Sequence, residues 1–328
     1  TSQSRTVTDF SGRVVEISAP ENINRVIITS HPIPSTLYDV TKGSEKLVGA
    51  TRSAFTTASE KILDLVVPDW RNINTTFMQG SASNLEEVMA LKPDLIIAYG
   101  NEQMQGLELL TVPVLNFYEN TKDNEETTIN RDRFMREIFG VTGAGTLQDE
   151  WNTANARITE SLRQVQGQKP IKALMIMDNT GSRITVRGTN TYGDSWIVKS
   201  GMVNVSSVNG DGVEVSLEQI YRWNPEIIIL QGGKPEKEYL ANTIGGQDWS
   251  QVQAVKDRKV YYAPKGISGW AAPNADSPMM AQWMIMKAYP QTYPEEEFIA
   301  ELIRYYQRRY NIAVTEEIAR EVIYPNGR

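Results

Sequence analysis

The chain has no cysteine and only one histidine, His31, among its 328 residues. Without cysteine it can form no disulfide framework, no thiolate metal site and no cysteine nucleophile, and this composition fits an exported protein without establishing export. A bare zinc or manganese ion favours several histidine or cysteine ligands, so such a site would depend mainly on carboxylates. These absences favour a chelated or anionic ligand over a bare metal ion.

Long apolar runs and an excess of basic residues are also missing. No stretch approaches the run of about 18 apolar residues that would predict a transmembrane helix. The formal net charge of −7 argues against nucleic acid and anionic membranes as partners, because both select basic surfaces. The polar start at residues 1–5 leads us to expect a mature or trimmed chain from which a targeting segment was removed.

The motifs of common enzyme classes are missing as well. The sequence contains no Gly-x-Gly-x-x-Gly segment between a strand and a helix, no Gly-Lys-Ser/Thr phosphate loop and no Gly-x-Ser-x-Gly elbow. Residues 188–193 contain two glycines but no following lysine, which indicates a strand-to-helix loop. We therefore predict a protein that is not an enzyme. A two-lobed metallocluster enzyme or transferase and a scaffold protein are the alternatives.

An internal repeat organises the chain, since residues 84–100 and 216–232 follow the same pattern. Each copy opens on a helix N-cap residue followed by a glutamate in the first turn, and a proline ends the helix. The short apolar runs that follow, 95–98 and 227–230, are typical of buried parallel strands. Two copies predict two similar lobes, and ligands bind such sheets at the carboxyl ends of the strands. The cleft between the lobes is therefore the expected site.

One long helix is predicted between the two copies. Apolar residues recur every three or four positions from Leu147 to Val165, which predicts a helix about 30 Å long, with Thr146 as its N-cap and Gly167 as its end. The predicted fold class is α/β, with two lobes of mainly parallel strands joined by this single rigid helix. The expected segments are an N-terminal lobe, a connecting helix and a C-terminal lobe with terminal helices, over residues 1–145, 146–167 and 168–328.

Five further segments occur in a characteristic order, namely residues 7–15, 24–27, 47–49, 201–205 and 254–261. Together with both repeat copies, they resemble the substrate-binding proteins of the iron-complex, siderophore, haem and cobalamin class, which serve ATP-binding-cassette importers. The resemblance extends from about residue 6 to residue 290. It implies two Rossmann-like lobes joined by a rigid helix, a ligand in the cleft between them, small hinge motion and delivery of the ligand to a membrane permease.

The resemblance leads us to expect capture of a metal complex, with an Fe(III)-siderophore as the main expectation. Haem, a corrinoid and a molybdate-like oxyanion are the alternatives on the same fold. No resident cofactor and no protein-bound metal ion are expected. We expect a monomer in the periplasm or outside the cell, either free or lipid-anchored at the membrane surface, with an ABC permease dimer as its partner.

Three polar residues are candidates for ligand contact. His31 follows the first predicted strand, residues 25–29, in a loop that two prolines keep out of a helix, and a loop histidine bonded to backbone is the alternative. Arg52 and Arg187 each follow a predicted strand and can supply the paired donors that bind carboxylate, hydroxamate or oxyanion oxygens. A solvated surface arginine is the alternative for both.

Aromatic residues at the expected cleft edge are the remaining ligand candidates. Tyr99 and Tyr118 end strands of the first lobe, and Tyr192 follows the Arg187 strand. Flat rings at such positions can line a pocket for a bulky chelate, although core packing is the alternative. We expect Trp270 to be exposed to the cleft and Trp196 to belong to the core.

Glu86 and Glu218 occupy the same place in the two repeat copies. In the family that the chain resembles, paired glutamates of this kind dock onto arginines of the two permease subunits, and Leu85-Glu86 and Leu217-Glu218 match that pattern. The alternative is that each glutamate only stabilises the helix N-terminus, which any acidic residue there would do.

Overall fold

Two β-sheets, one in each half of the chain, organise the molecule, of which this computed structural model describes residues 3–328. The N-terminal sheet has the order β4-β3-β7-β8, and all its neighbouring strands are parallel. Its strands are β3 (Val26–Ile28), β4 (Leu47–Ala50), β7 (Leu95–Ala98) and β8 (Val114–Asn116). Each strand is short and largely apolar, because helices cover a parallel sheet on both faces.

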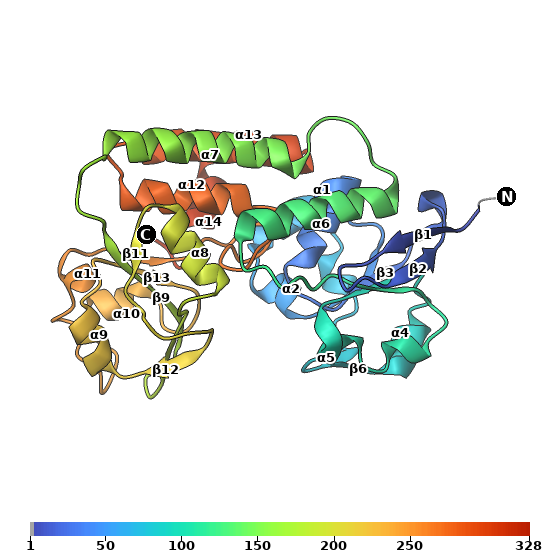
Figure 1. Cartoon of the computed structure of the whole chain (residues 1–328), viewed down its shortest axis with the longest axis horizontal. Helices are drawn as coiled ribbons and strands as arrows, with labels where there is room; N and C mark the ends of the chain where they lie inside the picture. Colours follow the sequence, from blue (N-terminus) through green and yellow to red (C-terminus); the bar gives the residue numbers. More distant parts are fainter. Residues whose placement is uncertain (1–2) are drawn as a thin grey trace.

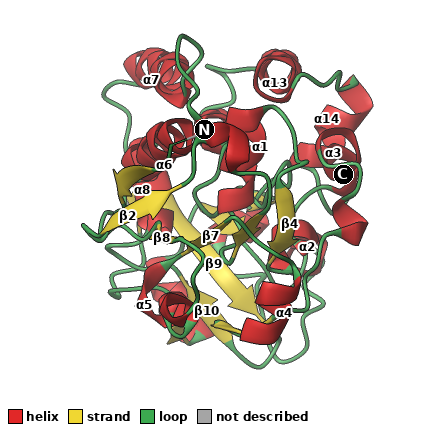
Figure 2. Ribbon diagram, turned by 90° about the vertical axis from the view of Figure 1, so that its right-hand side faces the viewer, coloured by secondary structure: helices red, strands yellow, loops and turns green. Residues whose placement is uncertain are grey.

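The helices of the first half lie on both sides of this sheet. In Figure 2, α1 (Ile33–Thr41) and α6 (Asn124–Phe139) lie above the strands, and α4 (Leu85–Ala90) and α5 (Gly100–Met104) lie below them. The smaller elements of this half are an antiparallel hairpin of β1 (Arg5–Thr8) with β2 (Val14–Ile17), a second of β5 (Met78–Gln79) with β6 (Ala82–Ser83), the helices α2 (Ser53–Thr56) and α3 (Glu60–Val66), and the 3-10 turns η1 (Pro20–Asn22), η2 (Trp70–Asn72) and η3 (Leu107–Leu109).

The C-terminal sheet is mixed, with the order β12-β10-β9-β13-β14 and with β11 also paired to β9. Its parallel part contains β9 (Lys172–Asn179), β11 (Val203–Asn204), β13 (Ile227–Leu230) and β14 (Val260–Tyr262). Its antiparallel part contains β10 (Ile184–Val186) and β12 (Val213–Val215). The helices of this half are α8 (Tyr192–Lys199), α9 (Leu217–Trp223), α10 (Glu236–Leu240), α11 (Gln253–Lys256), α12 (Ser277–Ala288), α13 (Glu295–Tyr310) and α14 (Glu316–Ile323).

The repeat has the local structure that its sequence predicts. The Asn84 side chain accepts a hydrogen bond from the Glu87 N–H at 3.1 Å at the start of α4. Ser216 accepts one from the Gln219 N–H at 3.2 Å at the start of α9, where a capping box forms. All four residues of β7 and of β13, the strands that follow, are buried. The predicted fold class, two α/β lobes with parallel sheets, is confirmed.

The connecting helix is α7, Leu147–Gln164, which runs across the top of the molecule in Figure 1. Thr146 occupies the N-cap position, as predicted, but its side chain makes no capping bond; Asp132 on α6 accepts the Leu147 N–H at 3.1 Å. The helix ends at Gln164, before Gly167, since the backbone already leaves helical geometry at Val165. The lobe bounds 1–145, 146–167 and 168–328 stay a prediction.

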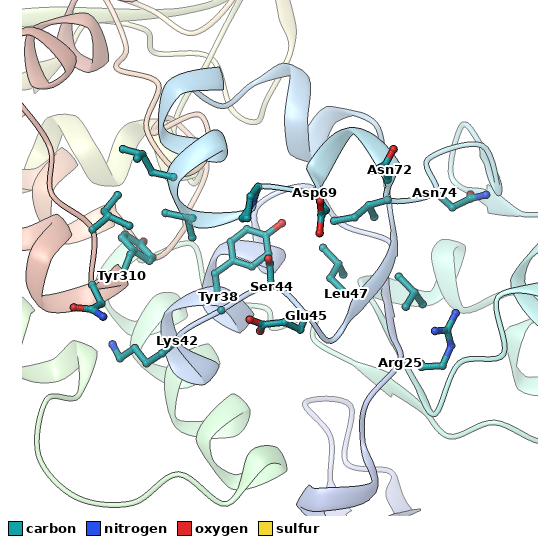
Figure 3. A pocket seen from close by; sticks show the side chains of 18 of the residues that line it. Arg25, Tyr38, Lys42, Ser44, Glu45, Leu47, Asp69, Asn72, Asn74 and Tyr310 are labelled. Atoms are coloured by element: carbon teal, nitrogen blue, oxygen red, sulfur yellow. The ribbon is translucent and has the colours of Figure 1, made fainter.

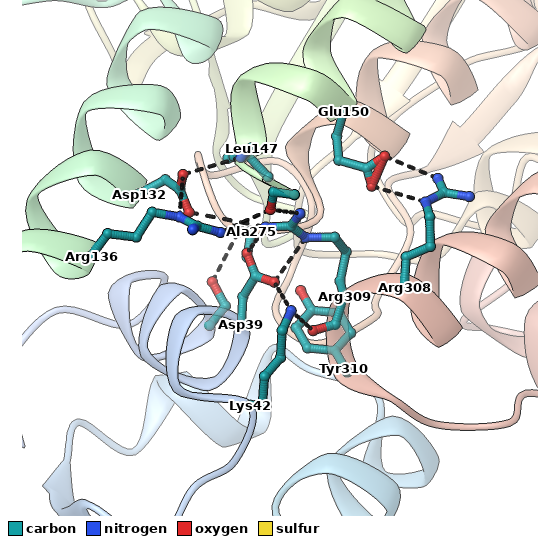
Figure 4. Close-up of polar contacts among 12 residues, drawn as sticks. Asp39, Lys42, Asp132, Arg136, Leu147, Glu150, Ala275, Arg308, Arg309 and Tyr310 are labelled. Atoms are coloured by element: carbon teal, nitrogen blue, oxygen red, sulfur yellow. Dashed lines mark hydrogen bonds and ion pairs between the residues drawn. The ribbon is translucent and has the colours of Figure 1, made fainter. Parts of the chain in front are cut away.

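The C-terminal helices add a second connection between the halves. Helix α12 packs along α7, and α13 reaches back to α1 of the first half. At the end of α13, the Arg309 guanidinium donates to both carboxylate oxygens of Asp39 on α1, at 2.8 and 2.6 Å (Figure 4). The largest core cluster accordingly contains residues of both sheets and of these helices. Within residues 3–328, no helix is long and apolar enough to cross a bilayer.

Candidate ligand-binding site

A cavity of about 210 Å³ lies between the two halves of the chain. Its first wall contains His31, which follows β3, and Thr57 at the end of α2. Its second wall contains Gln231, which follows β13, and Tyr262, the last residue of β14. The carboxyl ends of strands from both sheets therefore face this cavity, as expected for α/β lobes.

His31 lies in this cavity among basic groups. Helix α1 begins at Ile33, within the segment that two prolines were expected to keep out of a helix, because a proline in the first turn of a helix needs no N–H partner. Burial, together with the guanidinium charges of Arg131 and Arg187, lowers the pKa of His31 to about 4. The imidazole is consequently neutral near pH 7, with two permanent positive charges close to it.

Arg131, on α6, is a site residue that sequence reasoning missed. Its side chain is only 2% exposed, its Nη1 donates to the Pro273 carbonyl at 2.7 Å, and its guanidinium lies 5.7 Å from the Tyr99 ring centroid. Its Nε is buried and has no hydrogen-bond partner within residues 3–328. The sequence carried one signal for this burial, because Arg131 lies four residues from both Thr127 and Met135, which share the buried face of α6.

Arg187 reaches the same region from the end of β10. It is 7% exposed, and it donates from Nε to Gln231 at 2.5 Å and from Nη1 to Asp211 at 2.8 Å. Gly193 makes room for this side chain, because a Cβ at that position would lie 2.5 Å from the Arg187 Cδ. Arg187 is therefore fixed beside the cavity and is not a solvated surface arginine.

The three candidate tyrosines form a connected group. Tyr99 and Tyr118 meet edge to face, with their ring centroids 5.2 Å apart. Burial raises the pKa of Tyr99, and its interaction with the Tyr192 hydroxyl raises it further. The Lys122 ammonium lies 5.7 Å from the Tyr118 ring centroid and 5.2 Å from that of Tyr192. These rings join the basic region around His31, while Tyr99 and Tyr118 also line a neighbouring cavity of about 720 Å³.

The other candidates differ in their surroundings. Arg52 is exposed and makes no hydrogen bond or ion pair within residues 3–328, although it directly precedes α2, which ends at the cavity. Trp270 lines the interlobe cavity, but its side chain is not exposed to solvent, since it is fully buried and its indole N–H donates to Asp276 at 2.9 Å. Trp196 is a core residue, as predicted, with its indole N–H bonded to the Ala271 carbonyl.

The structure contains no ready-made metal-ion site in the part of the chain that it describes. No group of three or more histidine, cysteine, aspartate or glutamate side chains there is placed to hold a metal ion. The cavity is instead lined by the His31 imidazole, the Gln231 amide and Lys265, with Arg187 bonded to Gln231 beside it, and such groups suit oxygen atoms that carry negative charge.

The two repeat glutamates are exposed and free. Glu86 and Glu218 lie in the first turns of α4 and α9, and neither side chain makes a hydrogen bond or ion pair within residues 3–328. Glu87 is less available, because its carboxylate accepts a hydrogen bond from the Thr76 hydroxyl at 3.0 Å.

A family model described as "Periplasmic binding protein" matches residues 74–266, more than half of the chain. The chain belongs to the periplasmic binding protein family. This membership agrees with two α/β lobes joined by α7, and with a protein that binds a solute and catalyses no reaction.

Individual relatives cover nearly the whole chain. A periplasmic solute binding protein from Veillonella parvula is 28% identical, with a TM-score of 0.84 over 98% of this chain and 97% of that one. The molybdate-binding protein MolA of Haemophilus influenzae is 23% identical over 93% of this chain and 91% of its own. A structure of MolA bound to molybdate covers 95% of this chain and 99% of that one, with a TM-score of 0.78 and 21% identity, which shows a shared fold.

Proposed function

We propose that this protein serves an ATP-binding-cassette importer by capturing a molybdate-type tetraoxyanion in the cavity between its lobes. The observation that carries the proposal is the group of basic side chains beside one small cavity, since His31 lines it, Arg187 donates to the lining residue Gln231, and the charges of Arg131 and Arg187 both act on His31. The similarity to a molybdate-binding relative supports the same choice. An oxyanion therefore replaces an Fe(III)-siderophore as the first candidate ligand.

Charge explains why an anion suits this site. Arg131 and Arg187 are nearly completely buried, and bringing two positive charges into a low-dielectric cavity is unfavourable unless negative charge compensates them. Asp211 compensates Arg187 in part, at 2.8 Å. Arg131 has no acidic ion-pair partner within residues 3–328, and its Nε lacks an acceptor, so an oxyanion would supply both the charge and the acceptor.

Size supports the same ligand. The cavity of about 210 Å³ is smaller than the pockets of about 300–1,000 Å³ that hold drug-sized ligands. A single tetrahedral ion with four oxygen atoms needs little space and several donors. The walls offer the Gln231 amide and the Lys265 ammonium beside the single imidazole.

A ferric chelate, such as a siderophore complex, is the second candidate. Tyr99 and Tyr118 line a cavity of about 720 Å³, which is large enough for a bulky ligand. The Tyr118 side chain is 36% exposed and offers a flat face to such a ligand. The basic region around His31 would then bind the anionic oxygens of the chelate.

The two repeat glutamates are the proposed contacts through which the protein docks onto the membrane permease and delivers its ligand. Glu86 and Glu218 are exposed and unpaired, one on each lobe, so a permease with two matching basic surfaces can bind both. We place the protein in the periplasm or at the outer surface of the cell membrane.

Calorimetric titration of the protein with sodium molybdate tests the proposed ligand. We expect saturable binding without turnover, and Arg187→Ala should weaken it by about 1.5–3 kcal/mol, the value of a hydrogen bond to a charged group. The matched control is Arg163→Ala, which removes an exposed arginine paired only with Glu160.

A ferric tricatecholate and haemin serve as competing probes, measured by tryptophan fluorescence. Binding of either probe, together with no response to molybdate or tungstate, would replace the oxyanion with a chelate. Equal affinity of Arg187→Ala and the unmodified protein would move the site to the tyrosine group.

A further inference from the structure

A second and larger cavity, of about 770 Å³, lies at the amino ends of the strands of the N-terminal sheet. Its lining includes Arg25, which precedes β3, residues 42–45 between α1 and β4, and Leu91, which follows α4 and precedes β7. The interlobe cavity is instead lined by residues that follow strands. The two cavities thus lie at opposite ends of parallel strands, and this second one is independent of the oxyanion site.

Tyr38 provides the first sign that this cavity binds a ligand. Its side chain lines the cavity, is 2% exposed, and has a hydroxyl without a hydrogen-bond partner within residues 3–328. Figure 3 shows Tyr38 near the middle of the lining. Burial raises the pKa of Tyr38, so the group stays a neutral hydroxyl. A buried hydroxyl without a partner is costly to leave unbonded, and a ligand in the cavity would supply the missing hydrogen bond.

The basic side chains that line this cavity have hydrogen-bond partners in the described part of the chain, whereas its acidic side chains have none there. Lys42 is already occupied, since its ammonium donates to the Arg309 carbonyl at 2.6 Å and lies 3.4 Å from Asp39. Arg25 donates its Nε to the Leu91 carbonyl at 2.9 Å. The carboxylates of Glu45 and Asp69, by contrast, make no hydrogen bond or ion pair within residues 3–328. Of the charged groups that line this cavity, only these two carboxylates have no partner within residues 3–328.

The remaining wall is apolar. Side chains from α3, from the segment after it, from the end of α4 and from the C-terminal tail cover it, namely Leu65, Val66, Pro68, Ile73, Leu91 and Ile312. Leu65 is 41% exposed although it is a large aliphatic residue. An apolar body seated here would cover this surface.

We propose that this cavity binds a small organic cation, a protonated amine carried on an apolar skeleton. The ammonium would bind between the free carboxylates of Glu45 and Asp69. The Tyr38 hydroxyl would accept a hydrogen bond from the ammonium or donate one to a polar group of the same ligand. The apolar skeleton would lie against Leu65 and its neighbours. A carboxylate ligand fits poorly at this place, because its charge is repelled by both acidic side chains and because the Lys42 ammonium already pairs with Asp39.

Fluorine NMR of the full chain with para-fluorophenethylamine tests this proposal. We expect saturable binding at neutral pH, while para-fluorophenylacetate, which has the opposite charge, should not bind. The double variant Glu45→Gln, Asp69→Asn should weaken amine binding about tenfold or more, since it removes the charge of two acceptors. Molybdate binding should not change in this variant.

Two further variants separate a ligand site from a structural effect. Tyr38→Phe should weaken amine binding severalfold without lowering the melting temperature, because the hydroxyl has no protein partner to lose. Glu108→Gln is the matched control, since it neutralises an exposed carboxylate on η3, outside the cavity lining. It should leave the amine affinity unchanged.

Three results would overturn the proposal. The first is equal binding of the amine and the phenylacetate. The second is an amine affinity that the double variant leaves unchanged. The third is a Tyr38→Phe variant that is less stable but binds the amine normally, which would assign the hydroxyl to a structural water molecule only.

Discussion

Replacing Arg309 with methionine tests the second connection between the lobes. Arg309 is 3% exposed and Asp39 is 1% exposed, and their two hydrogen bonds join the end of α13 to α1. The guanidinium also donates from Nη1 to the Gly145 carbonyl at 2.6 Å (Figure 4). In Arg309→Met, the buried Asp39 carboxylate keeps only Lys42 as a cationic neighbour, at 3.4 Å.

The expected loss follows from this burial. Removing one partner of a buried ion pair leaves a charge without compensation and costs about 3–5 kcal/mol. Equilibrium unfolding in urea, followed by tryptophan fluorescence, measures the difference as a lower midpoint with an unchanged slope. Because 3 kcal/mol is a large share of the about 5–15 kcal/mol by which proteins are stable, the effect will be clear.

The neighbouring arginine supplies a matched control. Arg308 pairs with Glu150 and Glu301, but its side chain is 42% exposed. Arg308→Met should therefore cost no more than about 1 kcal/mol, as expected for an exposed ion pair. The double variant Arg309→Met, Asp39→Leu should recover part of the loss, because it removes the uncompensated carboxylate. Equal losses in the two single variants would refute the reasoning.

Three further predictions concern the ligand, the lobes and the partner. The pKa of His31 is lowered from 6.5 to about 4, so the unfolded chain binds more protons between these values, and stability should fall by up to about 3 kcal/mol as the pH drops through this window; His31→Gln should remove that part of the pH dependence in thermal unfolding. Small-angle scattering should show only a small fall in radius of gyration on ligand binding, because α7 and α13 both connect the lobes, and a fall as large as in wide hinge-closing proteins would contradict this. Glu218→Arg should impair ligand uptake by cells more than Glu86→Arg, with unchanged ligand affinity, since Glu87 lies beside Glu86 and Gln219 beside Glu218; normal uptake by the double variant would leave helix stabilisation as their role.

Local sequence patterns predicted most of the elements. The repeat predicted β7 and β13 at their observed bounds, because an apolar run after a helix-ending proline has few other structures open to it. The connecting helix α7 also followed from the three- and four-residue spacing of its apolar residues. The order of the strands in each sheet was not predicted, since it depends on contacts between distant segments.

The site was predicted in part. Placement after a strand brought His31 and Arg187 into consideration, and both lie in the interlobe region. Arg131 was missed because it lies within a charged helical segment that looks solvated, and only the packing of α6 shows that its side chain is buried. Trp270 was expected at the cleft and does line the interlobe cavity, but its full burial was not predicted, since nothing local shows that Asp276 binds its indole N–H.

The sequence by itself determined the two α/β lobes, the helix between them and the preference for an anionic or chelated ligand. These depend on local periodicity, capping residues and composition, which act over a few neighbouring positions. Only the tertiary structure decided that Arg131 joins His31 and Arg187, and that α13 returns to the first lobe through Arg309 and Asp39. These residues are far apart in the chain. The energy of interaction between their charges depends on burial and distance, which no local pattern encodes.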